Sequence, residues 1–311
     1  MKTKRACTIG LLCAAFLLCF CHSRESENLQ GKKPPVVVAT LFTVYDFARH
    51  IADGRANVTL LLPPGVEAHS FEPKPGDMLK IADADLFLYT GKYMEPWVES
   101  VLRGADNKKL LVVDTSSGIT LMQDSQEFGE RHSPDAYDPH IWLDFTNAQK
   151  MVDNILKGLV QIDPENGDFY TQNAGAYKAQ LEDMDKEYKD GLSNCKRDTF
   201  VHGGHFAFNY LAHRYHLHYV SAYAGSPNAE PSPKKMIELK KMIERDNVRY
   251  IYYEELITPR VAEVLARETG VKLLKLSGAH NISKEELADG KTFIDLMKEN
   301  LKNLEVGLQC R

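Results

Sequence analysis

Short apolar runs alternate with segments of helical spacing along the first half of the chain. Val36–Leu41 is almost wholly apolar, as expected of a strand buried on both faces, and residues 43–53 then place apolar side chains three or four positions apart. The pattern predicts further strands at Val58–Leu62, Leu86–Tyr89 and Leu110–Val113, and helices at Pro75–Ala82, Tyr93–Val101 and Thr146–Val160. Repeated βα units of this kind predict a parallel sheet covered by helices on both faces.

The same alternation resumes after Cys195. It predicts strands at Thr199–Val201, His218–Tyr223, Val248–Tyr253 and Val271–Leu276, and helices at Phe206–Tyr215, Ser232–Asp246, Pro259–Thr269 and Lys291–Leu308. The chain is therefore expected to be an α/β protein built of two βα lobes.

The segment Pro164–Leu192 separates the two series of βα units. It has no internal proline, a single glycine and a one-sided apolar stripe, and as one helix it would be roughly 42 Å long. A helix of that length favours a rigid connector between lobes over an ordinary domain helix. The predicted boundaries are 34–163 for the first lobe, 164–194 for the connector and 195–311 for the second lobe.

Residues 1–21 have the pattern of an export signal. A basic start with Lys2, Lys4 and Arg5 precedes an apolar stretch too short for a membrane span, which requires about 20 residues. Leu18 lies three positions before Cys21, as in a bacterial lipoprotein cleavage site, although Phe20 stands where a small residue is usual. We expect lipidation at Cys21, with Cys19 as the other candidate and simple cleavage as the alternative.

An exported chain would be periplasmic or lipid-anchored at the cell envelope, with residues 22–33 as a polar tether. The formal charge is −5, and removing the three positive charges of the export signal leaves −8. This balance gives no indication of nucleic-acid binding. Four of the six cysteines belong to the export signal, and two remaining cysteines in an exported chain favour a disulfide between Cys195 and Cys310, with two free thiols as the alternative.

Three histidines stand in short, unlike phrases at predicted strand ends: Gly65-Val-Glu-Ala-His-Ser-Phe-Glu-Pro73, Asp138-Pro-His-Ile-Trp142 and His205-Phe-Ala-Phe-Asn-Tyr210. Ligands of open parallel sheets bind outside the carboxyl ends of the strands, and neutral imidazole is the commonest protein ligand for metals such as zinc. A cleft between the lobes would bring His69, His140 and His205 together. Taken singly, each histidine is more often a surface residue or a satisfied core residue.

These phrases resemble those of the metal-binding solute receptors of bacterial ABC importers, the cluster A-I zinc and manganese receptors. The segments Glu230-Pro-Ser-Pro233, Tyr252-Tyr-Glu254 and Asp163-Pro-Glu-Asn166 extend the resemblance over about residues 34–311. It implies two (β/α)4 lobes, a rigid connecting helix and a metal in the cleft between the lobes. It also implies delivery to a membrane permease by a monomeric receptor, rather than catalysis.

The resemblance carries His69, His140 and His205 over as the first three metal ligands. The family's fourth ligand is an aspartate, and its position here falls on Ser277, so the expected carboxylate is missing. His280 follows three residues later and is the obvious substitute, with a water molecule as the alternative. Glu254 is the next carboxylate candidate, either as a ligand or as a residue that orients a ligand histidine.

The resemblance also bears on the metal, because a histidine at the position of His205 is associated with zinc in this family and a glutamate with manganese. Imidazole ligands and the general order of affinities likewise favour zinc over manganese. Manganese or iron transport, a zinc hydrolase and an adhesin role remain alternatives. A hydrolase is disfavoured because the chain has neither an HExxH helix nor a Gly-x-Ser-x-Gly turn.

Overall fold

The computed structural model describes residues 33–105, 107–123, 137–223, 231–254 and 259–311. The predicted export signal, both lipidation candidates and all of the tether except Lys33 lie outside the described residues, as does most of the acidic segment between the first lobe's last strand and His140. No helix among the described residues combines the length and apolar character needed to cross a membrane.

The first lobe contains a sheet of four parallel strands in the order β2-β1-β3-β4. The strands are β1 (Val36–Ala39), β2 (Asn57–Leu60), β3 (Leu86–Tyr89) and β4 (Leu111–Asp114). Val37 and Leu86 belong to one buried cluster, whereas their neighbours Val38 and Phe87 belong to another. Side chains alternate between the faces of a strand, so a run that is apolar at every position is buried on both faces.

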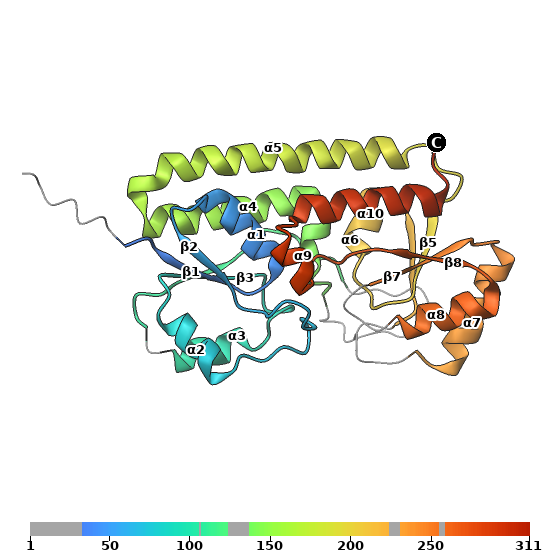
Figure 1. The fold of residues 1–311 in the computed structure, drawn as a ribbon, viewed down its shortest axis with the longest axis horizontal. Coiled ribbons are helices and arrows are strands. Elements are labelled where there is room, and N and C mark those ends of the chain that lie inside the picture. Colours follow the sequence, from blue (N-terminus) through green and yellow to red (C-terminus); the bar gives the residue numbers. More distant parts are fainter. Residues whose placement is uncertain (1–32, 106, 124–136, 224–230, 255–258) are drawn as a thin grey trace, which may run out of the picture. The chain divides into compact units, whose positions relative to one another are not determined.

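Helices cover both faces of this sheet (Figure 1). One face packs against α1 (Phe42–Ala52) and α4 (Phe145–Ile162), and the other against α2 (Pro75–Ala82) and α3 (Val98–Gly104). The residues before α3 were expected to be helical from Tyr93. They form a turn instead, because the buried carboxylate of Glu95 accepts hydrogen bonds from the backbone N–H groups of Thr90 and Gly91.

The second lobe repeats the arrangement, with strand order β6-β5-β7-β8. Its strands are β5 (Thr199–His202), β6 (His218–Ser221), β7 (Tyr250–Tyr253) and β8 (Lys272–Lys275). Its helices are α6 (Asn209–Arg214), α7 (Pro233–Arg245), α8 (Arg260–Thr269), α9 (Lys284–Ala288) and α10 (Phe293–Leu308). In both lobes the strand order reverses beside the first strand, which places a topological switch point between β1 and β3 and another between β5 and β7.

Two elements of this lobe differ from the expectation. Helix α6 begins at Asn209 rather than at Phe206, so His205 lies in the loop before the helix. The short helix α9 was not expected, and its capping box identifies its start: the Ser283 hydroxyl accepts a hydrogen bond from the Glu286 N–H, while the Glu286 carboxylate accepts one from the Ser283 N–H.

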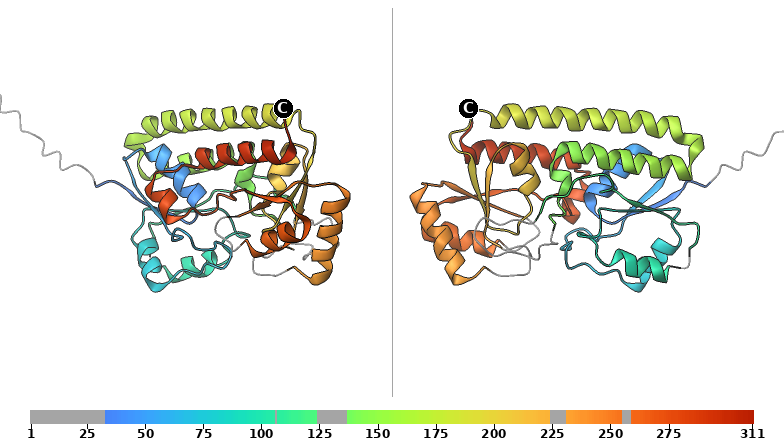
Figure 2. Two further views of the ribbon diagram at one scale, coloured as in Figure 1. Left: turned by 45° about the vertical axis from the view of Figure 1, so that its right-hand side comes forward. Right: turned by 180° about the vertical axis from the view of Figure 1, so that it is seen from behind.

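The connector is confirmed as a long helix, α5 (Gly167–Leu192), which starts after a single 3-10 turn at Pro164–Asn166. Its 26 residues span about 39 Å at 1.5 Å per residue. It runs along α4 of the first lobe and α10 of the second (Figures 1 and 2). Tyr170, Tyr177 and Tyr188 belong to the stripe of buried side chains on α5. The ring of Tyr177 packs against Phe47 of α1, and the Tyr188 hydroxyl donates to the Met297 carbonyl of α10.

The carboxy-terminal end of the chain is joined covalently to the end of α5. Cys195 and Cys310 form the disulfide that was one of the two expected states of this pair. The two cysteines also pair through an isolated backbone bridge. The disulfide therefore joins the chain segments that follow the ends of α5 and α10.

Candidate metal centre

His69 is presented by the loop that follows β2. The side chain of Glu67 accepts hydrogen bonds from the backbone N–H groups of His69 and Ser70, at 2.8 and 2.7 Å. These two bonds hold the loop in a tight turn. The pKa of His69 lies well below the ordinary value because burial disfavours the imidazolium and because His205 and His280 are nearby.

His140 lies immediately before the 3-10 turn Ile141–Leu143 and is buried. Asp138 accepts hydrogen bonds from the His140 backbone N–H at 2.9 Å and from its Nδ1 at 2.7 Å. This contact fixes the tautomer, because a proton on Nδ1 leaves the Nε2 lone pair free for a metal. Burial lowers the pKa of His140 well below its usual range, and His205, His69 and His280 lower it further.

His205 follows β5, and Glu254 directly follows β7, so both lie at the second lobe's switch point. The Nδ1 of His205 donates to Glu254 Oε1 at 2.8 Å. This is the contact that an orienting residue would make, and Glu254 also offers a carboxylate oxygen within 4.8 Å of ligand atoms of His205 and His280. Although burial alone would raise the pKa of Glu254, the adjacent His205 lowers it to about 2, and Glu254 in turn raises the pKa of His205.

The Nε2 atoms of the three histidines converge. His140 Nε2 lies 3.2 Å from His69 Nε2 and 3.1 Å from His205 Nε2, and the three ligand nitrogens all lie within 4.8 Å of one another. Tetrahedral zinc with Zn–N bonds of about 2.0–2.1 Å separates its ligand nitrogens by about 3.3–3.4 Å. The two separations from His140 Nε2 are therefore close to those of a tetrahedral zinc site.

The spacing also requires a positive species between the rings. His140 and His205 both have a carboxylate on Nδ1, so each is oriented with Nε2 toward the other ring. Two lone pairs at 3.1 Å repel unless a proton or a cation lies between them. A metal ion that replaces this proton satisfies all three rings at once.

His280 belongs to the same cluster. Its ring centre lies 5.5 Å from that of His205 and 6.1 Å from that of His69, and its side chain is buried. His280 also offers a ligand atom within 4.8 Å of one from each of His205 and Glu254. Its Nδ1 has no hydrogen-bond partner within the described part of the chain, and burial lowers the pKa of its imidazole to about 4.

Ser277, by contrast, is held against α10 rather than in the cluster. Its backbone N–H donates to Asn300 Oδ1 at 2.7 Å, and its carbonyl accepts from Asn300 Nδ2 at 2.8 Å. The Ser277 hydroxyl accepts a hydrogen bond from the Ala279 N–H. Of the three residues considered for the fourth position, Ser277 is bonded to α10, whereas His280 and Glu254 both offer a ligand atom within 4.8 Å of one from His205.

Two residues near the centre were not assigned a role from the sequence. Asp138 is the first, although a carboxylate two positions before a ligand histidine is a recognisable orienting signal. His202 is the second of these residues. It ends β5, is fully buried, and lies with its Nε2 3.7 Å from Glu254 Oε1.

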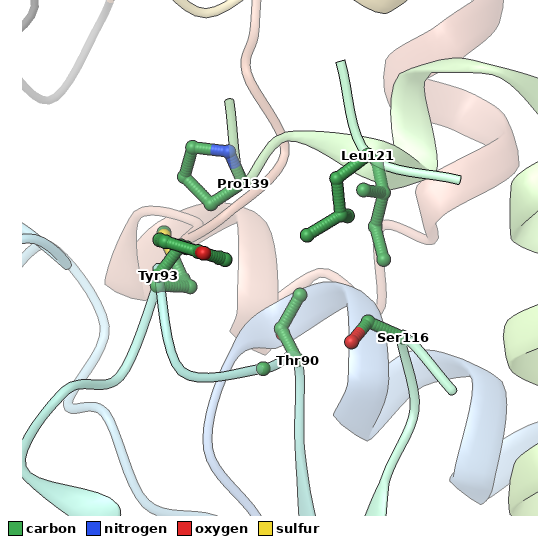
Figure 3. Close-up of a pocket in the computed structure, with 8 residues that line it drawn as sticks. Thr90, Tyr93, Ser116, Leu121 and Pro139 are labelled. Atoms are coloured by element: carbon green, nitrogen blue, oxygen red, sulfur yellow. The ribbon is translucent and has the colours of Figure 1, made fainter. Parts of the chain in front are cut away.

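Other features near the centre do not contribute to it. His213, His216 and His218 are exposed on the second lobe. Figure 3 shows a small, mostly apolar cavity beside the loop that carries His140. Its lining includes Thr90, Tyr93, Leu121 and Pro139 but none of the four clustered histidines, so it is separate from the centre.

The family model described as "Zinc-uptake complex component A periplasmic", ZnuA, matches residues 37–307. The chain is 39% identical to the high-affinity zinc uptake system protein ZnuA of Bacillus subtilis, over 92% of this chain and 91% of that protein. It is 34% identical to the zinc-binding lipoprotein AdcA of Streptococcus pneumoniae, over 96% of this chain but only 59% of AdcA.

Solved structures agree with these matches. The Zn(II)-bound ZnuA-like domain of Streptococcus pneumoniae AdcA superposes with a TM-score of 0.75 at 35% identity, covering 88% of this chain and 98% of that domain. This is the two-lobed fold expected from the sequence, in which a long helix joins two parallel sheets. Both the sequence match and the fold cover almost the whole described part of the chain, and the chain therefore belongs to the ZnuA family of solute receptors of zinc-uptake systems.

Proposed function

We propose that the protein captures Zn²⁺ between its lobes through His69, His140, His205 and His280, and delivers it to the membrane permease of an ABC importer. The observation that carries the proposal is the convergence of three Nε2 atoms at 3.1–3.2 Å, with two of the rings held by carboxylates. The names of the relatives, a zinc uptake protein and a zinc-binding lipoprotein, support the same metal.

The charges around the cluster suit a divalent cation. Four neutral imidazoles leave the charge of +2 uncompensated, but Asp138 and Glu254 each accept a hydrogen bond from a ligand imidazole. Two carboxylates thus balance the ion without binding it directly. Such contacts orient the rings and make their nitrogens more basic.

The ligand type favours zinc over the other candidates. Manganese prefers carboxylate and carbonyl oxygens, and its affinity for nitrogen sites is below that of zinc. Iron(II) likewise precedes zinc in the general order of affinities. A catalytic role is set aside because the family is one of solute receptors rather than enzymes.

The proposal is tested by titrating the metal-free protein with zinc and with manganese. We expect zinc to bind more tightly than manganese, and His280→Ala to weaken zinc binding because one imidazole is lost. His213→Ala is the matched control, since it removes an exposed imidazole from the same lobe. Equal or tighter binding of manganese would refute zinc as the cargo. Unchanged zinc affinity in His280→Ala would remove His280 from the ligand set.

The family's location outside the cytoplasm agrees with the predicted export signal. We further propose that the mature receptor acts as a monomer and is anchored by a lipid on Cys21, or on Cys19. The lipoprotein named among the relatives supports an anchor of this kind.

A further inference from the structure

The segment that carries His280 follows β8 in the chain and was assigned to the second lobe from the sequence. We call residues 277–283 the strap. Its residues are buried up to Ile282, and its first residue, Ser277, is held by Asn300 of α10. The residues after Ser277 form hydrogen bonds with the first lobe instead.

Beyond Ser277, the strap is bonded to the first lobe at successive residues. Trp142 Nε1 donates to the Gly278 carbonyl at 2.8 Å, and the Phe42 N–H donates to the His280 carbonyl at 3.2 Å. The Gly65 N–H donates to the Ile282 carbonyl at 2.9 Å. Phe42 begins α1, and Gly65 lies in the loop that leads to His69, so the strap contacts the elements that surround the metal centre.

Asn281 makes the most extensive of these contacts. Its buried side-chain amide donates to the carbonyls of Pro63 at 2.9 Å and Val66 at 2.6 Å, and its Oδ1 accepts from the Ile282 N–H. One side chain therefore ties the loop of His280 to the loop of His69.

Helices α9 and α10 begin beside α1 of the first lobe (Figure 1). The Phe293 N–H at the start of α10 donates to Asp46 Oδ2 at 3.0 Å, and the Phe293 ring packs edge-on against Phe47 at 5.1 Å. The first lobe thus holds the chain at Ile282, near the end of the strap, and again at Phe293, where α10 begins. The strap follows this lobe rather than the strands of the second.

We propose that Asn281 is a positioning residue of the metal centre, which fixes His280 to the first lobe so that three imidazoles form a preassembled half-site there. The proposal rests on the metal-binding function proposed above. The half-site consists of His69, His140 and His280, and the second lobe contributes His205 with its orienting residue Glu254. Metal exchange then requires the second lobe to withdraw a single ligand.

The first test replaces the amide of Asn281 with a carboxylate of the same shape. Asn281→Asp loses both N–H donors and turns an oxygen toward two carbonyls, so the loops of His280 and His69 lose their common anchor. We expect zinc affinity to fall about 10–100-fold, the range seen when an orienting contact of a metal ligand is lost.

The matched control is Asn154→Asp. Asn154 is also buried, and its amide also donates to two carbonyls of the first lobe, those of Thr115 and Ser117, away from the histidines. Both variants should lower the melting temperature of the metal-free protein, but only Asn281→Asp should weaken zinc binding. An equal fall in zinc affinity in both variants would reduce Asn281 to a purely structural residue.

A double-mutant cycle and a spectroscopic probe separate positioning from general destabilisation. If Asn281 acts through His280, Asn281→Ala should cost little further zinc affinity once His280 is alanine, whereas independent effects would add. His205→Ala should still bind Co²⁺ through the half-site and give its absorption bands, and Asn281→Ala in that background should abolish them. Additive losses, or the absence of Co²⁺ bands in folded His205→Ala, would overturn the proposal.

These outcomes are distinguishable from a failure of the proposed function. A wild-type protein that binds no zinc would refute both proposals together. A wild-type protein that binds zinc, with an Asn281→Asp variant of equal affinity, would refute the half-site alone.

Discussion

At the scale of single residues, the centre depends on carboxylates that hold imidazoles in one tautomer. Asp138 and Glu254 each lie 2.7–2.8 Å from the Nδ1 of a histidine, and each is buried with its partner. Because the proton stays on Nδ1, Nε2 of both rings remains available for the metal. Each lobe supplies one such pair of a carboxylate and a histidine to the centre.

This arrangement predicts the effect of Glu254→Gln. The substitution keeps the shape of the side chain but removes its charge, so His205 loses its anionic acceptor and the bound cation loses one balancing carboxylate. We expect zinc affinity to fall about 10–100-fold in a competition titration with a chelator. Glu263→Gln, which removes one negative charge at an exposed position of α8, should leave the affinity unchanged. Equal affinities of the two variants would contradict the role of Glu254.

At the scale of elements, one carboxylate links α5 to α6 of the second lobe, in addition to the packing of α5 against α10. Asp185 accepts hydrogen bonds from Arg214 Nε and Nη2, both at 2.6 Å, from Lys189 Nζ at 2.7 Å and from the Tyr215 hydroxyl at 2.9 Å. Burial opposes ionisation, but these donors, led by Arg214, lower the pKa of Asp185 to about 2. The carboxylate thus joins the carboxy-terminal third of α5 to α6.

The lowered pKa predicts how stability changes with pH. An unfolded aspartate has a pKa of about 3.9, so between about pH 4 and pH 2 the unfolded chain binds a proton at Asp185 that the folded protein does not. The stabilisation is present above about pH 4 and is lost as the pH falls toward 2. In urea titrations of the metal-free protein, Asp185→Asn should be less stable at pH 7 and should lose less stability over this window. Parallel stability curves for the two proteins would contradict the assignment.

At the scale of the whole molecule, two linkages that lie far apart join segments distant in the sequence. The strap joins the lobes at the metal centre, and the Cys195–Cys310 disulfide joins α5 and α10 at the far end of α10. Helix α10 lies between the two, and its 16 residues span about 24 Å. We therefore expect the contributions of the strap and of the disulfide to stability and to zinc binding to be independent of each other.

The disulfide tests this separation. It links residues 115 positions apart, and its removal in Cys195→Ser/Cys310→Ser should cost about 2–5 kcal/mol of unfolding free energy, because the unfolded chain is no longer restricted. Zinc affinity should be nearly unchanged, because the linkage lies a helix length from the histidines. Urea unfolding and zinc titration of the same variant measure the two quantities. A large loss of affinity would show that the far end of α10 is coupled to the centre.

The sequence predicts most of this fold because the apolar pattern of each strand and helix indicates which of its faces are buried. Val36–Ala39 is apolar at every position and is buried on both faces, and the one-sided stripe of Tyr170, Tyr177 and Tyr188 predicts the packing of α5. The three histidine phrases, together with the family resemblance, predict which histidines converge. Short loops are harder, because Glu95 and Ser283 decide the structure of residues around them through single hydrogen bonds.

The strap could not be predicted for a different reason. Several of its partners in the first lobe are backbone groups, the N–H groups of Phe42 and Gly65 and the carbonyls of Pro63 and Val66, which do not depend on the identity of the residue. The Asn281 side chain reaches Pro63 across 218 positions. The predicted boundary at residue 195 assigns all later residues to the second lobe and does not predict that residues 278–282 are bonded to the first.

The strap also has a consequence for the order in which the chain acquires its structure. Domains generally fold as units, the amino-terminal one first, while the chain is still being made. Here the bonding partners of the Phe42 and Gly65 N–H groups are supplied by residues 280 and 282, close to the carboxy-terminal end. The N–H groups of Phe42 and Gly65 can therefore form these two hydrogen bonds only after nearly all of the chain has been synthesised. A receptor cut short before the strap would keep His69 and His140 but would lack the segment that holds their loops together.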